Sequence, residues 1–316
     1  MELSSAENIK NILQKFNAKP KKGLGQNFLI DKNILQKIVE SSNIKPDDVI
    51  LEVGPGLGVL TQELAKKAKR VIAVEKDKTM CEILKENLKD FSAQGGPASG
   101  WKNIEIINDD ILKISNIQYL ISNKNTENLN FKNSIENWEL GISNYKVVAN
   151  IPYYLTSQLI RKFLEEKIQP QEIILMIQKE VAQRICAKVP DMNLLAVSVQ
   201  FYAKPEIIFN VSKNSFWPIP KIDSAIIKIT PRSQTSREAG GPTSPDLFFR
   251  IVKAGFSQPR KQLGGNLSKI LKIKKEEVTE WLTKNNLSPI QRAETLSIQD
   301  WKNLATTLPQ GKKDRE

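Results

Sequence analysis

The chain has 316 residues, of which 47 are Lys or Arg and 35 are Asp or Glu, so its formal net charge is +12. Apolar residues make up 40% of the sequence, which is enough for a sizeable core and too many for a disordered chain. There is no histidine, and the two cysteines, Cys81 and Cys186, stand far apart. This composition excludes His-based triads, His metal sites, thiolate zinc sites and a disulfide framework, so we expect no bound metal.

The N-terminal 16 residues contain no long apolar run, and no stretch approaches the roughly 20 apolar residues of a membrane span. We therefore expect a reduced, soluble, cytoplasmic protein without a membrane partner. Its positive charge favours a polyanionic partner. Basic residues gather near both ends of the chain, at Lys15, Lys19, Lys21 and Lys22 and at Arg260, Lys261, Lys269, Lys272, Lys274 and Lys275.

Short apolar runs rich in Val and Ile recur between residues 49 and 178 without strict alternation, which is typical of strands buried on both faces of a parallel sheet. They cover residues 49–54, 70–75, 104–108, 146–150 and 173–178. Apolar residues at helical spacing predict helices over 57–67, 79–89 and 155–166. This alternation predicts a doubly wound, Rossmann-like α/β sheet.

Two further runs, 196–202 and 224–229, are predicted to close the far edge of the sheet as an antiparallel pair. Residues 92–100 predict a flexible loop, and the Asn-rich stretch 115–144 predicts a surface insertion. The composition of residues 234–245 is that of a linker. Helical patterns follow at 248–254, 260–271, 276–284 and 298–306. We expect a Rossmann-like domain over 1–233, a linker over 234–245 and a small all-α domain over 246–316.

A glycine loop follows the first predicted strand of the sheet, with Glu52 two residues before Gly54 and further glycines at Gly56 and Gly58. Glycines let a backbone turn sharply and approach a ligand closely. A dinucleotide fingerprint would need glycine at position 59, where the chain has Val59. The spacing instead resembles the S-adenosylmethionine (AdoMet) loop of Rossmann-like methyltransferases, and an acid such as Glu52 suits a cationic sulfonium.

Two more acids stand at the ends of the next predicted strands. Glu75 ends the second strand, where a carboxylate can accept both ribose hydroxyls. Asp110 follows the third strand and is predicted to accept a hydrogen bond from the adenine amino group. A glycine loop followed by two acids in this order is far more specific than the loop alone.

The fourth predicted strand runs into Asn150-Ile151-Pro152-Tyr153, at the sheet edge where ligands bind in α/β folds. An adenine amine is a poor nucleophile because its lone pair is delocalised into the ring. The Asn150 side-chain oxygen and the Ile151 or Pro152 carbonyl can accept its hydrogens, and Pro152 fixes the turn. Tyr153 is predicted to stack on an extruded base, with Phe216 as a second stacking face. No strong general base is needed, because the proton leaves a cationic amine.

These motifs, in this order, resemble the KsgA family of small-subunit ribosomal RNA adenine dimethyltransferases. The matching stretches are 23–31, 51–58, 150–157, 178–184, 216–224, 254–267 and 292–297. The resemblance implies AdoMet-dependent N6,N6-dimethylation of two adjacent adenosines in the 3′-terminal hairpin loop of 16S rRNA. It also implies a pre-30S particle as the substrate and a monomeric enzyme.

The same resemblance implies the site residues. Its cofactor contacts correspond to Asn27, Leu29, Gly54, Glu75, Asp110 and Asn150. An N-terminal flap over residues 15–32 would then cover the cofactor, and Lys21, Lys22, Lys221, Arg260 and Lys261 would contact RNA. The chain departs from the family where a further basic residue is usual, because Gly264 and Gly265 stand in the predicted helix and lower its stability. The stretch 115–144 is also longer than expected.

Other readings remain open at this point. Erythromycin-resistance methyltransferases share the Asn-Ile-Pro-Tyr motif and the AdoMet loop but modify large-subunit rRNA. DNA adenine methyltransferases usually have an acid where this chain has Asn150. A non-catalytic ribosome assembly factor could also keep the fold, although intact Glu75, Asp110 and Asn150 argue against that reading.

Overall fold

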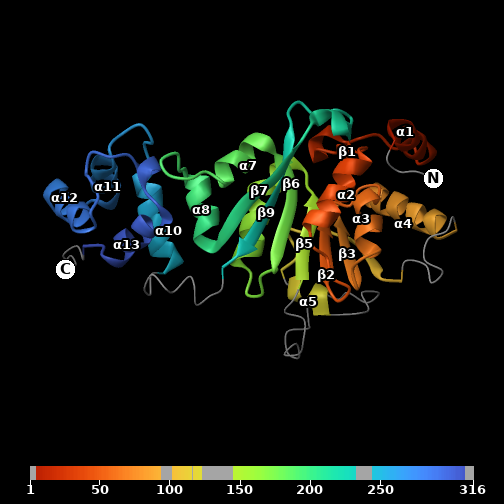
Figure 1. The fold of residues 1–316 in the computed structure, drawn as a ribbon, viewed down its shortest axis with the longest axis horizontal. Helices are drawn as coiled ribbons and strands as arrows, with labels where there is room; N and C mark the ends of the chain where they lie inside the picture. The colour runs from red at the N-terminus through yellow and green to blue at the C-terminus, as the bar shows by residue number, and fades with distance from the viewer. Residues whose placement is uncertain (1–4, 94–101, 116, 123–144, 233–243, 310–316) are drawn as a thin grey trace. The chain divides into compact units, whose positions relative to one another are not determined.

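The computed structural model describes the chain except for residues 1–4, 94–101, 116, 123–144, 233–243 and 310–316. Most of the predicted loop, insertion and linker therefore lies outside the described residues. The chain forms two compact units (Figure 1). The first comprises Met1–Ala182 and Glu206–Thr230, and the second comprises Gln183–Pro205 and Pro231–Glu316. Residues 183–205 thus group with the C-terminal helices, whereas the sequence places them in the sheet domain.

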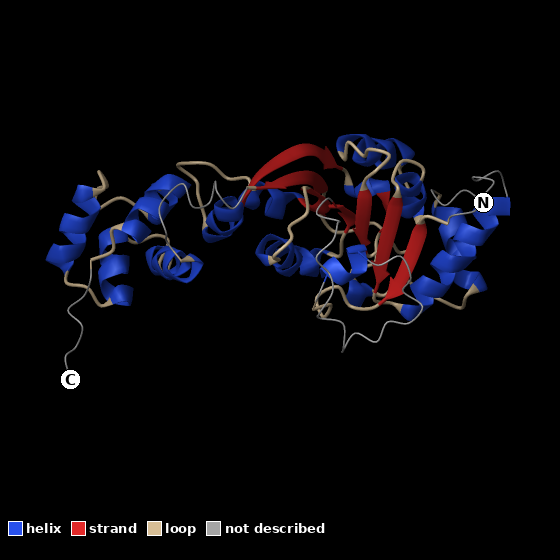
Figure 2. Cartoon of the chain, turned by 90° about the horizontal axis from the view of Figure 1, so that it is seen from below, coloured by secondary structure: helices blue, strands red, loops and turns tan. Residues whose placement is uncertain are grey.

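A mixed seven-stranded sheet forms the centre of the first unit (Figures 1 and 2). Its strand order is β4-β3-β2-β5-β6-β9-β7. The strands are β2 (Val49–Val53), β3 (Arg70–Glu75), β4 (Ile104–Asn108), β5 (Tyr145–Asn150), β6 (Glu172–Gln178), β7 (Ala203–Val211) and β9 (Ser224–Pro231). The five from β2 to β6 pair in parallel, and β9 is antiparallel to β6. This confirms the predicted α/β fold, and the five parallel strands lie within one residue of their predicted bounds.

Helices surround the sheet of the first unit (Figure 2). They are α1 (Ala6–Lys15), α2 (Lys32–Ser41), α3 (Val59–Ala65), α4 (Lys78–Ala93), α5 (Ile117–Ser122) and α6 (Thr156–Glu165), with α7 (Lys179–Ile185) at its boundary. One core cluster joins Leu35 and Ile38 of α2 and Leu64 of α3 to strand residues such as Ile50 and Val148. Every residue of β2 is buried, which explains its uninterrupted apolar pattern.

The N-terminal flap is tied to the sheet domain by a second, two-stranded sheet. It runs through a short 3-10 turn (Lys22–Leu24) into β1 (Phe28–Leu29), which pairs antiparallel with β8 (Phe216–Trp217). Asp31 caps α2 by accepting hydrogen bonds from two backbone N–H groups, and it also accepts one from the Ser215 hydroxyl at 3.0 Å. The flap is therefore an ordered wall that sequence periodicity alone would not reveal.

The second unit consists of helices α8 (Leu194–Tyr202), α10 (Pro245–Gly255), α11 (Leu263–Leu271), α12 (Lys275–Lys284) and α13 (Ile298–Thr306). The prediction of a strand over 196–202 is wrong, because this stretch is α8. Asn193 caps the helix by accepting a hydrogen bond from the Ala196 N–H group, and Phe201 packs against Phe248 of α10 with ring centroids 4.2 Å apart. Burial on several sides gives α8 an apolar sequence that resembles a buried strand.

The second predicted C-terminal helix, over residues 260–271, begins later than expected. Helix α11 starts at Leu263 rather than at residue 260, since the chain turns at Pro259 and the Lys261 N–H group donates to the Gln258 carbonyl at 2.9 Å. Arg260 and Lys261 therefore lie in a turn before the helix. Among the described residues, no helix combines the length and the apolarity that crossing a membrane would require.

Candidate active site

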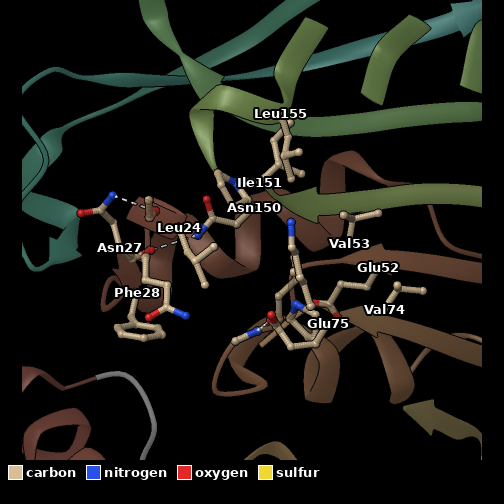
Figure 3. A pocket seen from close by; sticks show the side chains of 18 of the residues that line it. Leu24, Asn27, Phe28, Glu52, Val53, Val74, Glu75, Asn150, Ile151 and Leu155 are labelled. Atoms are coloured by element: carbon tan, nitrogen blue, oxygen red, sulfur yellow. Dashed lines mark hydrogen bonds between the residues drawn. The ribbon is translucent and has the colours of Figure 1, made fainter. Parts of the chain in front are cut away.

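A cavity opens at the carboxyl ends of β2, β3 and β5, with the flap forming part of its wall (Figure 3). Since β2 lies between β3 and β5, the cavity occupies the point in a doubly wound sheet where ligands bind. All of its lining residues belong to the first unit. They include the predicted Asn27, Leu29, Glu52, Gly54, Gly56, Glu75, Asp110, Asn150, Pro152, Tyr153 and Phe216.

The glycine loop forms the floor of this cavity in a backbone conformation that needs glycine. The φ angles of Gly54, Gly56 and Gly58 are +68°, +58° and +89°. A Cβ atom on Gly58 would lie 2.4 Å from the Leu84 Cδ1 atom, and one on Gly56 would lie 3.4 Å from the Phe28 ring. The loop is therefore left-handed and closely packed at once. Gly58 caps α3, which explains its importance although it is not among the lining residues.

Glu75 is held in place by backbone hydrogen bonds. Its Oε2 atom accepts from the Gly56 N–H group at 3.2 Å, and its Oε1 atom accepts from the Asp77 N–H group at 2.8 Å. Burial raises the pKa of Glu75, while these N–H donors oppose the shift. The carboxylate is thus fixed at the end of β3 and faces the cavity with its geometry already set.

Glu52 is more deeply buried, with 1% of its surface exposed. Burial raises its pKa to about 8; the nearby Thr61 hydroxyl opposes the shift and the Glu75 carboxylate adds to it. Among the described residues, none forms a hydrogen bond with Glu52 Oε2. Burial thus favours the protonated form of Glu52 in the free protein, and its predicted role beside a sulfonium stays a prediction.

Asp110 lies at the rim of the cavity, where its carboxylate already has partners. The Lys76 ammonium lies 2.9 Å from Oδ2, and the Leu112 N–H group donates to Oδ1 at 3.1 Å. Partial burial would raise the pKa of Asp110, but these two contacts outweigh it and lower the pKa. Asp110 is thus an ionised acceptor beside a half-exposed lysine that sequence reasoning did not single out.

Asn150 ends β5 on the opposite side of the cavity (Figure 3). Its side-chain nitrogen donates to the Asn27 carbonyl at 3.4 Å, and the Asn27 side chain donates to the Gly25 carbonyl at 3.1 Å. With its nitrogen engaged by the flap, Asn150 keeps its side-chain oxygen as an acceptor. The Pro152 carbonyl already accepts from the Leu155 N–H group at 3.0 Å, which favours the Ile151 carbonyl as the second acceptor.

The aromatic residues around Asn150 differ in their exposure. The Tyr153 hydroxyl forms a 2.9 Å hydrogen bond with the buried Ser224 hydroxyl, so its ring is anchored to β9. Tyr154, which the sequence left without a role, is 52% exposed and lines the cavity. Phe216 lines the cavity but is only 1% exposed and packs into the core with Leu29, so its predicted role as a second stacking face stays a prediction.

A polar network that the sequence did not reveal joins the flap to β3. The Asp77 carboxylate, 2% exposed, lies 2.9 Å from the Lys21 ammonium and accepts from the Gln26 side-chain nitrogen at 3.1 Å. Lys21 was expected to face RNA, yet its side chain is 54% exposed and paired with this acid. Only the position of Asp77, two residues after Glu75, could have drawn attention to it.

The other residues predicted to contact RNA lie on both units. Lys221 is exposed in the first unit, and Arg260 and Lys261 are exposed in the second. The side chain of Lys22 lies outside the described part of the structure. No cluster of three or more acidic or Cys side chains suited to a metal ion occurs among the described residues.

Comparison with known proteins gives one consistent answer. The family model for ribosomal RNA adenine dimethylase matches residues 17–310. Ribosomal RNA small subunit methyltransferase A of Alkaliphilus oremlandii (strain OhILAs) is 40% identical over 313 residues, covering 97% of this chain and 98% of the relative. The same-named protein of Dehalococcoides mccartyi (strain BAV1) is 40% identical and covers 93% of this chain and 90% of the relative.

Solved structures agree on the fold. A dimethyladenosine transferase from Plasmodium falciparum has a TM-score of 0.64 and 26% identity, covering 88% of this chain and 95% of that one. The 23S rRNA methyltransferase ErmE has a TM-score of 0.62 at 24% identity, covering 90% of this chain and 100% of that one, which shows the fold alone. From its near full-length match and its relatives, this chain belongs to the ribosomal RNA adenine dimethylase family.

Proposed function

We propose that this protein transfers methyl groups from AdoMet to N6 of two adjacent adenosines in the 3′-terminal hairpin loop of small-subunit (16S) rRNA. The observation that carries the proposal is the pairing, across one cavity, of a fixed ribose-type acceptor, Glu75, with an amide acceptor, Asn150. The names of the relatives support the small subunit as the target.

The residues present suit AdoMet. Gly54 and Gly56 of the left-handed glycine loop line the cavity with backbone, and Glu75 has the burial and orientation to accept ribose hydroxyls. Asp110 would accept from the adenine amine if Lys76 moves aside. Asn27 and Leu29 of the flap would close over the ligand. When bound, AdoMet supplies a methyl group on a sulfonium.

Asn150 would orient the target base. Its side-chain oxygen and the Ile151 carbonyl would accept the two amine hydrogens, drawing the nitrogen away from conjugation with the ring. Tyr153 would stack on the extruded adenine, and Pro152 would hold the turn that aims the carbonyl. The proton lost by the cationic amine can pass to water, which is consistent with a chain that has no histidine. The remaining contribution of the protein is alignment.

The proposal extends to the partner. Lys22, Lys221, Arg260 and Lys261 would contact the phosphate backbone of rRNA within a pre-30S particle, as cations on nucleic-acid-binding proteins do. The acceptor is ribosomal, so the reaction would take place in the cytoplasm, and one copy of the chain would act as a monomer.

The test is methyl transfer with labelled AdoMet to small-subunit particles that lack these methyl groups. We expect label in the small-subunit rRNA and none in large-subunit rRNA. Label in the large subunit alone would favour the erythromycin-resistance reading. Absence of label from both, with intact AdoMet binding, would favour an assembly factor without this activity.

A further inference from the structure

The flap holds residues that face both ligands of the proposed reaction, so its placement matters for the whole site. Through Asn27 it provides the carbonyl that engages Asn150, and through Phe28 it contacts the glycine loop. Gly25, with φ +60°, lies beside Pro152, where a Cβ atom would be in van der Waals contact with the proline Cβ at 3.4 Å. A small movement of the flap would therefore disturb both the amide and the floor of the cavity.

Three polar side chains fix the flap beside β3, and we call Lys21, Gln26 and Asp77 the flap anchor. The Lys21 N–H group donates to the Gln26 side-chain oxygen at 2.8 Å, and both side chains point their nitrogen atoms at Asp77 Oδ2. The other oxygen, Oδ1, accepts from the Thr79 N–H group at 3.1 Å. The buried carboxylate is thus fully engaged, with the flap on one oxygen and α4 on the other.

The anchor also reaches the cofactor carboxylate. The Asp77 N–H group donates to Glu75 Oε1, so the residue that receives the flap also helps to orient the predicted ribose acceptor. A continuous series of contacts then runs from Glu75 through Asp77 to Lys21 and Gln26, and along the flap to Asn150. Each contact within it is a hydrogen bond, an ion pair or a peptide link.

We propose that Asp77 is a positioning residue that fastens the flap, through Lys21 and Gln26, in the arrangement that binds AdoMet and orients Asn150. This inference rests on the proposed function for the identity of the ligand. It assigns Lys21 to cofactor binding by way of Asp77, in place of the direct RNA contact expected from the sequence. Asp77 and Lys21 touch neither ligand in this account and act through the flap.

The experiment compares Lys21→Met, Lys21→Arg and Asp77→Asn in the full-length protein, with Lys19→Met as a matched control. Lys19 is exposed and lies in the same basic segment, so its replacement removes the same charge without touching the anchor. Calorimetry with AdoMet alone measures affinity. Hydrogen exchange of residues 25–29 reports the placement of the flap independently of activity.

We expect Lys21→Met and Asp77→Asn to weaken AdoMet binding roughly tenfold, the loss of one hydrogen bond to a charged group. Exchange in the flap should rise in both, while exchange in the central strands stays unchanged. Lys21→Arg should restore most of the affinity, and Lys19→Met should bind AdoMet as the wild type does. A double variant that combines Lys21→Met with Asp77→Asn should bind AdoMet no more weakly than Asp77→Asn alone, because each single change already breaks the ion pair between these two side chains.

Equal AdoMet affinity in Lys19→Met, Lys21→Met and wild type, with unchanged flap exchange, would overturn the inference. Should Asp77→Asn fail to fold, the comparison of Lys21→Met with Lys19→Met decides alone, since both lysines are exposed. A wild-type protein that binds no AdoMet would instead refute the proposed function. The two failures are therefore distinguishable.

Discussion

The side-chain nitrogen of Asn150 lies 3.4 Å from the backbone carbonyl oxygen of Asn27, although the two residues are 123 positions apart. This contact fixes which end of the amide faces the cavity, because a carbonyl accepts only from the nitrogen. The amide oxygen is thereby kept for a donor such as an adenine amine. The flap and the end of β5 therefore act as one unit in presenting the substrate acceptor.

Replacing Asn150 by Ala should suppress methyl transfer while leaving AdoMet affinity within a few-fold of wild type. The lost acceptor acts on the amine, and removal of one preorganised polar group typically lowers turnover by about 10²–10³-fold. Single-turnover methyl transfer and calorimetry measure the two effects separately. Near-normal turnover would exclude Asn150 from gripping the amine.

Replacing Glu75 by Ala should weaken AdoMet binding by roughly 10²-fold, because two hydrogen bonds to a charged group are lost. The variant also frees the Gly56 and Asp77 N–H groups, so Glu75→Gln is the matched control: it keeps the shape but loses the charge. Calorimetry should rank wild type, Gln and Ala in decreasing affinity. Unchanged affinity in both variants would show that the ribose is bound elsewhere.

The hydrogen bond between Tyr153 and Ser224 should show coupling in a double-mutant cycle. Removing either hydroxyl leaves the other without a partner near the core, at a cost of about 1–3 kcal/mol. Replacing both, as Tyr153→Phe with Ser224→Ala, should cost less than the two single changes added together. Urea unfolding measures these free energies, and strict additivity would mean that the hydroxyls do not interact in solution.

Glu52 should make the free protein less stable as the pH rises. Its folded pKa, about 8, lies above the usual value of 4.5, so the folded protein holds a proton that the unfolded chain releases in this window. The stabilisation is complete below the unfolded pKa and is lost as pH rises through the folded one, by up to about 1.4 kcal/mol per pH unit. Glu52→Gln should lack this slope.

Unfolding of wild type and Glu52→Gln at pH 5.5 and pH 7.5 tests that expectation without ligand. Between pH 5.5 and pH 7.5 the free energy of unfolding should fall more for the wild type than for Glu52→Gln, since glutamine stays neutral at both pH values. A constant difference between the two proteins at both pH values would mean that Glu52 does not hold the proton.

The adjacent glycines of α11 should respond in opposite directions to replacement by Ala. A Cβ atom on Gly265 would meet no atom within 4 Å beyond its chain neighbours and its own helix backbone, so Gly265→Ala should stabilise the protein by about 1 kcal/mol. One on Gly264 would lie 3.1 Å from the Pro289 carbonyl oxygen, so Gly264→Ala should destabilise it. Urea unfolding followed by tryptophan fluorescence measures the free energy of unfolding of both variants. Equal changes in the two variants would contradict this packing.

The sequence predicted the sheet well because local and long-range signals agree there. Strands such as Arg70–Glu75 and Ile104–Asn108 have their predicted bounds, since short runs rich in Val and Ile that are flanked by charges and turns favour strands. The strand predicted over 196–202 failed for the reverse reason. An apolar helix surrounded by other helices has no polar face to reveal its period.

The site divides along similar lines. Glu75 and Asn150 are visible in sequence because motif spacing places them at strand ends. The raised pKa of Glu52 and the burial of Phe216 could not be predicted, because both depend on tertiary packing that no local sequence pattern indicates. The pairing of Lys21 with Asp77 spans 56 positions, and a basic cluster in a sequence cannot show which of its members is already neutralised.

The central claim, that Asn150 and the cofactor wall form an adenine dimethylation site for small-subunit rRNA, is tested most directly by mass spectrometry of rRNA after reaction with undermethylated small-subunit particles. We predict two adjacent N6,N6-dimethyladenosines in the 3′-terminal hairpin loop, four methyl groups in all, and none with Asn150→Ala. Methyl groups at another position, or their undiminished appearance with Asn150→Ala, would contradict the account.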